Sequence, residues 1–129
     1  MTIAEVSKQY NLSADTLRYY ERIGLIPPVG RTSGGIRDYT EEDCRWIEFA
    51  KCMRGAGLAI EALVEYVSLF QQGDETVPAR KQILMEQRDH LIEKIQEMQS
   101  TLERLNFKIE RYEQSVLPVE RKLKKNAES

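Results

Sequence analysis

The residues best suited to binding chemistry lie in one segment, residues 13–39. In its first half, apolar side chains recur at helical spacing, and Arg18, Tyr19 and Arg22 fall on the opposite side of the same helix. A short exposed face with two guanidinium groups and one aromatic ring suits the DNA major groove, where arginine contacts phosphates and base edges. The alternative interpretation of a lone helix of this kind is a solvated amphipathic surface.

The second half of the segment carries the signals of a hairpin. Gly24 ends the helix, and Pro27 and Pro28 prevent its continuation. The stretch GRTSGG then supplies turn residues between two short extended runs. Arg31 and Arg37 therefore flank the tip of a positively charged wing.

A second short helix precedes this segment. Thr2 and Glu5 fit a capping box, and Asn11 and Leu12 form a tight turn into Ser13, a good N-cap. Two short helices joined by such a turn and followed by a basic hairpin describe a winged helix-turn-helix. We therefore expect an all-α fold with a small β wing. The expected DNA-contacting residues are Ser13, Asp15, Thr16, Arg18, Tyr19, Arg22, Arg31, Gly35, Arg37 and Tyr39.

Three stretches, TIAEVS, TLRYYERIGLIPP and GIRDYTEED, resemble the MerR family of bacterial transcription regulators. The resemblance covers essentially the whole chain, and the run RYYE-x-x-GL followed by G-x-R-x-Y is a specific signal. It implies a dimer that binds a pseudo-palindromic promoter in double-stranded DNA, with half-sites one or two helical turns apart. It further implies activation by DNA distortion, which aligns two promoter elements for RNA polymerase.

Two further helices are expected to complete the DNA-binding domain, residues 1–72. Thr40 caps the third helix, and the fourth runs from about Ala59 to Gln71. The apolar residues that share one side of the third helix are expected to pack against the first two helices. These residues are Trp46, Phe49, Ala50 and Met53.

Apolar residues alternate at spacings of three and four from about residue 77 to residue 116. This heptad seam predicts a helix about 50 Å long that requires a partner helix, and the chain offers no second helix of matching length. We therefore expect a homodimer, and the family resemblance adds that the helices run antiparallel. The predicted dimerisation residues are Leu91, Ile95, Met98, Leu102, Leu105, Ile109 and Tyr112. Pro118 is expected to end this segment, residues 73–118, and to leave a short basic tail, residues 119–129.

Composition and motifs argue against other classes of protein. The net charge is −2, and the acidic excess lies in residues 58–118, away from the proposed DNA face. No apolar run is long enough to cross a membrane and no signal peptide is apparent, so we expect a cytoplasmic protein. The single histidine, His90, has no nucleophile near it in sequence, and no phosphate-binding loop or zinc spacing occurs. We expect no enzymatic activity, no cofactor and no metal.

Cys52 is the candidate sensing residue. Its place between the third and fourth helices resembles the branch of the MerR family that responds to aldehydes and nitrosothiols through one thiol without a metal. Lys51 and Arg54 favour a thiolate, whereas the helix C-terminus opposes one, and a buried packing role is the alternative. In that alternative the effector is a non-covalent apolar ligand. Two other classes remain open, a coiled-coil scaffold and a DNA-bending architectural or excision factor.

Overall fold

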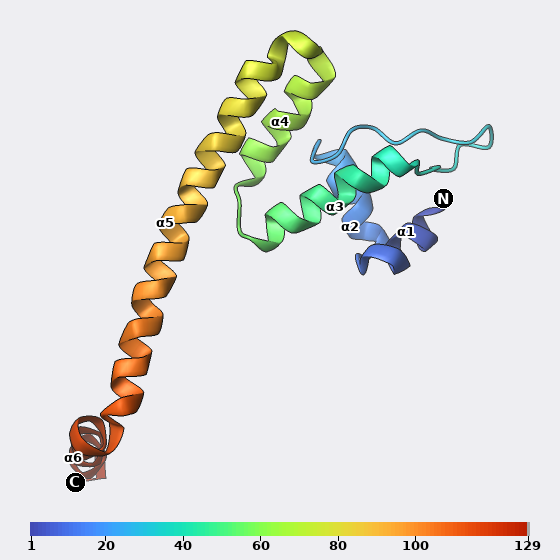
Figure 1. Cartoon of the computed structure of the whole chain (residues 1–129). Coiled ribbons are helices and arrows are strands. Elements are labelled where there is room, and N and C mark those ends of the chain that lie inside the picture. Colours follow the sequence, from blue (N-terminus) through green and yellow to red (C-terminus); the bar gives the residue numbers. More distant parts are fainter. Residues whose placement is uncertain (129) are drawn as a thin grey trace. The chain divides into compact units, whose positions relative to one another are not determined.

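The structure is a computed structural model that describes residues 1–128, so Ser129 of the predicted tail lies outside it. All regular elements of the described residues are helical (Figure 1). They are α1 (Ile3–Tyr10), α2 (Ala14–Arg22), α3 (Glu41–Gly55), α4 (Ile60–Gln72), the 3₁₀ turn η1 (Asp74–Thr76), α5 (Val77–Glu110), the π-helical turn η2 (Tyr112–Val116) and α6 (Leu117–Glu128). Internal contacts divide the chain into two compact units, Met1–Leu91 and Ile92–Ser129, which are described separately.

Side-chain caps define the starts of the first helices, as their sequences predict. In α1, Thr2 Oγ1 accepts from the Glu5 amide at 3.2 Å and Glu5 Oε1 accepts from the Thr2 amide at 3.0 Å. Ser13 Oγ accepts from the Thr16 amide at 3.0 Å and caps α2. Asn11 ends α1 in the left-handed conformation, with φ of 53°. These caps fix the tight turn of the helix-turn-helix.

The core of the first unit joins α1, α2, the following loop and α3. Its largest fully buried side chains are Leu17, Leu25, Ile26, Ile47 and Val6. Ala50 belongs to this core, as expected, and so does Cys44. Trp46, Phe49 and Met53 pack against this core, as expected, but they are only half-buried. Trp46 and Phe49 also contact the ring of Tyr66 in α4, which the sequence did not predict.

The predicted β wing is a turn without strands in the described residues. A single isolated antiparallel bridge joins Arg31 to Arg37. Inside it the Thr32 amide donates to the Ile36 carbonyl at 2.7 Å. Gly35 has a φ of +82°, a conformation that favours glycine. Outside the bridge the Asp38 amide donates to the Gly30 carbonyl at 2.8 Å, but no second bridge among the described residues extends the pairing into a ladder.

The beginning of α5 belongs to the first unit, whereas the sequence predicts a boundary after residue 72. The Thr76 hydroxyl donates to the Leu69 carbonyl at 2.7 Å, and Gln87 Oε1 accepts from the Ala59 amide at 3.4 Å. Ile83 is buried. The first turns of α5 thus lie along α4 (Figure 1), because the apolar side of α4 needs a covering helix.

The end of the long helix also differs from its prediction. The heptad pattern predicts a helix to residue 116 that Pro118 ends, but α5 stops at Glu110 and η2 follows. Pro118 lies in the first turn of α6, a position that tolerates proline. The expected short basic tail belongs to a twelve-residue helix, α6.

Candidate nucleic-acid interface

The exposed side of α2 carries the predicted recognition residues. Arg18 Nη1 lies 3.0 Å from Asp15 Oδ1, and both side chains are exposed. Such an ion pair contributes little to stability, so the guanidinium is free to exchange Asp15 for a phosphate or a base edge. Tyr19 is exposed, and the Arg22 guanidinium lies 5.4 Å from the centre of its ring. The structure thus brings Arg18, Tyr19 and Arg22 onto the surface of one helix.

Ser13 and Thr16 lie at the amino end of the same helix. Their hydroxyl oxygens are 2.8 Å apart, and Ser13 Oγ also accepts the Thr16 amide. Their hydrogen bonds hold the helix terminus, where free amides and the helix dipole favour an anion. Both residues therefore position the recognition helix.

The wing presents a guanidinium and an apolar side chain. Arg31 Nη1 donates to the carbonyl of Gly35 at 2.9 Å, which holds the arginine across the turn. The side chain of Ile36 is 64% exposed. Ile36 is not among the predicted contact residues, although an exposed apolar residue at a hairpin tip is a signal for a contact surface.

Arg37, predicted as a direct DNA contact, is held in an ion pair in the structure. Its Nε lies 2.7 Å from Glu21 Oε1, and both side chains are mostly buried. The other carboxylate oxygen, Glu21 Oε2, accepts from the Val29 amide at 3.2 Å. Glu21 therefore anchors the wing to α2. This role is not apparent in the sequence because the two partners lie 16 positions apart.

Tyr39 is a core residue in the structure and not part of the exposed face. Its side chain is 2% exposed, and its hydroxyl is a buried polar atom without a hydrogen-bond partner among the described residues. Burial raises the pKa of this hydroxyl; the charges of Arg37 and Arg18 lower it, and those of Glu21 and Asp43 raise it further. The hydroxyl is therefore neutral.

The candidate sensing residue, Cys52, is an exposed free thiol near the end of α3. The two neighbouring cations are hydrogen-bonded to backbone carbonyls. Lys51 Nζ donates to the Tyr10 carbonyl, and Arg54 Nη1 donates to the Leu58 carbonyl at 2.9 Å. Exposure supports access by a reagent. A cavity of about 170 Å³ lies beyond the same end of α3. Its lining is mostly apolar and consists of Met53, Leu58, Leu63, Ile83, Leu84, Gln87, Arg88 and Leu91.

The seam residues of α5 leave apolar surface exposed on the single chain. Met98 is 72% exposed and Ile109 is 69% exposed, and the intervening seam residues are also exposed. Leu91 is half-buried, and Tyr112 lies in η2. A continuous apolar stripe of this kind is typical of a helix that packs against another helix.

Two other kinds of site are not found in the part of the chain that the structure describes. No group of three or more histidine, cysteine, aspartate or glutamate side chains lies close enough to hold a metal ion. No helix there has the length and apolar character needed to cross a membrane.

Comparisons with known proteins identify a family of similar sequences. The profile of the MerR HTH family regulatory proteins matches residues 1–69, and the profile named "MerR, DNA binding" matches residues 44–106. The chain is 67% identical to the HTH-type transcriptional regulator AdhR of Bacillus subtilis over 93 residues, which span 72% of this chain and 66% of AdhR.

Two solved structures have a similar fold. A Listeria monocytogenes protein described as a MerR family transcriptional regulator has a TM-score of 0.86 at 48% identity, over 99% of this chain and 98% of that one. HiNmlR, a MerR family regulator lacking the sensor domain, bound to promoter DNA, has a TM-score of 0.79 at 28% identity, over 88% and 90%.

Proposed function

This chain belongs to the MerR family of DNA-binding transcription regulators, and we propose that it acts as a homodimer at a pseudo-palindromic promoter. Each protomer places α2 in a major groove and the wing on the adjacent backbone. The observation that carries this proposal is the exposed set Arg18, Tyr19 and Arg22 on the second helix of a helix-turn-helix. The structure of HiNmlR bound to promoter DNA supports it.

The long helix supports an antiparallel dimer. If a two-fold axis crosses the seam midway between Met98 and Leu102, Met98 faces Leu102 of the partner subunit, and the other apolar positions pair in the same way. Arg88, which lies between Leu84 and Leu91 at the same spacing, is the one charged residue in this series. It then comes opposite the partner's Tyr112. In a parallel pair Arg88 would meet its own copy, and two like charges would be brought together. The antiparallel arrangement avoids that repulsion.

Activation in this proposal proceeds by distortion of the bound promoter. Two DNA-binding units joined by long helices grip the DNA at separated half-sites, and phosphate contacts on both sides offset the energy needed to bend and untwist it. RNA polymerase then engages the two promoter elements that this distortion aligns. The protein acts in the cytoplasm on double-stranded DNA.

The trigger that we propose is covalent modification of Cys52. The thiol is exposed at the hinge between α3 and α4, so an adduct there changes the contacts between the two helices. The alternative trigger is a non-covalent apolar ligand in the adjacent cavity, which its mostly apolar lining favours.

One transcription assay separates the two triggers. Wild-type protein, Cys52→Ala and Cys44→Ala are compared on the same promoter, with and without an aldehyde. Because Cys44 is buried and Cys52 is exposed, induction should persist in Cys44→Ala and disappear in Cys52→Ala. Full induction of Cys52→Ala by the aldehyde contradicts thiol sensing and leaves the apolar cavity as the candidate.

A further inference from the structure

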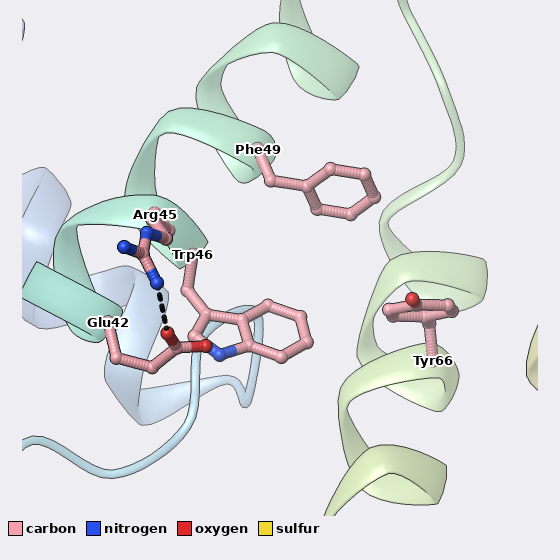
Figure 2. A pocket seen from close by; sticks show the side chains of 5 residues that line it. All are labelled: Glu42, Arg45, Trp46, Phe49 and Tyr66. Atoms are coloured by element: carbon pink, nitrogen blue, oxygen red, sulfur yellow. Dashed lines mark hydrogen bonds and ion pairs between the residues drawn. The ribbon is translucent and has the colours of Figure 1, made fainter.

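A second cavity lies between the first half of α3 and the middle of α4. Its volume is about 150 Å³, and Figure 2 shows the five side chains that line it. They are Glu42, Arg45, Trp46, Phe49 and Tyr66. Neither the predicted DNA-contacting residues of α2 nor Cys52 lines this cavity, so a ligand bound here would not contact them.

Three aromatic rings form the walls of this aromatic pocket. The Trp46 and Phe49 rings are nearly perpendicular, at 89° with centroids 6.3 Å apart. Tyr66 lies 6.0 Å from Trp46 and 5.8 Å from Phe49. The rings are half-buried and face a common space (Figure 2). Phe70 packs on Trp46 at 4.8 Å and fixes the indole.

None of the three rings of this pocket makes a cation–π contact with a side chain of the described residues. The cation–π contacts among the described residues involve Tyr19, Phe70 and Phe107. An aromatic ring has a negative face, so three rings around one space attract a positive group.

A carboxylate stands beside the rings. Glu42 Oε2 pairs with Arg45 Nη1 at 3.0 Å, and the two side chains are 60% and 72% exposed. An exposed pair of this kind is weak, so another cation can replace Arg45 at Glu42. The surrounding segment, residues 41–72, contains six acidic and three basic residues, which also favours a positive ligand.

We propose that the aromatic pocket binds a small organic cation of the quaternary ammonium class. The ammonium group lies against the faces of Trp46, Phe49 and Tyr66, and Glu42 supplies the counter-charge. A cavity of about 150 Å³ is known to accommodate benzene, so the ligand has roughly six or seven non-hydrogen atoms. Since the pocket connects α3 to α4, an occupied pocket adds contacts between these helices.

Trp46 is the only tryptophan of the chain, so its fluorescence reports on this pocket directly. The full-length protein is titrated with choline at constant ionic strength, and in parallel with 3,3-dimethylbutan-1-ol, a neutral compound of nearly the same shape. We expect a saturable change with choline and an affinity at least tenfold weaker for the neutral alcohol. Equal affinities overturn the proposal, because shape alone then explains binding, and so does the lack of saturation with choline.

Matched variants locate the binding in the aromatic pocket. Glu42→Gln should weaken choline binding several-fold, while Glu41→Gln, a neighbouring carboxylate that does not line the pocket, should leave it unchanged. Tyr66→Leu should weaken it at least tenfold, with circular dichroism to verify folding. Because Glu42 is exposed, its variant folds even if Tyr66→Leu does not. Unchanged affinity in Glu42→Gln contradicts the proposal. The titration contains no DNA, so its outcome is independent of the proposed promoter binding.

Discussion

At the scale of single residues, two arginines predicted to contact DNA differ in their environment. Arg18 has only an exposed partner, whereas Arg37 shares a mostly buried carboxylate with the Val29 amide. A helical wheel places Arg18 on the surface from the sequence alone. The partner of Arg37 lies on another element, so the sequence did not reveal it.

Arg18→Ala should weaken promoter binding by at least about 1 kcal/mol, because one charged contact to phosphate or base is lost. The stability of the free protein should change little, since the pair with Asp15 is exposed. Fluorescence anisotropy with labelled promoter DNA measures the affinity. Arg45→Ala, which removes an equally exposed arginine from α3, is the control. An affinity equal to that of wild type would remove Arg18 from the recognition surface.

Tyr39→Phe tests the buried hydroxyl. Because this atom has no hydrogen-bond partner among the described residues, its removal should leave the free energy of unfolding unchanged or raise it by up to about 1 kcal/mol. Urea unfolding measures this change, and a loss of more than about 1 kcal/mol would show that the hydroxyl has a stabilising partner.

At the scale of elements, local signals were sufficient for the helix starts but not for their packing. The caps Thr2 and Ser13 act within three residues, so the sequence predicts them directly. The side of α3 that Trp46 faces depends on where α4 lies, which no local pattern specifies. The π-helical turn after Arg111 likewise interrupts a heptad pattern that continues through it in the sequence.

Glu21→Gln should loosen the wing. The amide oxygen can still accept from Val29, but Arg37 loses its charged partner in a mostly buried position, so we expect a loss of about 2 kcal/mol. Urea unfolding at fixed protein concentration measures it. Glu42→Gln, in an exposed pair, should change stability by less than about 0.5 kcal/mol. Equal effects of the two substitutions would contradict the anchoring role of Glu21.

At the scale of the whole molecule, the apolar seam of α5 is exposed on the single chain, and a partner helix would bury it. Leu102→Lys places a charge in that seam and should dissociate the proposed dimer, at a cost of several kcal/mol. Ser100→Lys, two positions away and so on the opposite side of the helix, should not. Sedimentation velocity measures both variants. A Leu102→Lys protein with the mass of a dimer would exclude the seam as the interface.

The central claim is that two copies of α2 read two related half-sites, and in vitro selection from a random duplex library tests it most directly. The wild-type protein should enrich an inverted repeat whose half-sites lie one or two helical turns apart. Arg18→Ala, carried through the same selection, should enrich it weakly or not at all. Enrichment of a single unrepeated site, or no enrichment by the wild-type protein at moderate salt, would contradict the account.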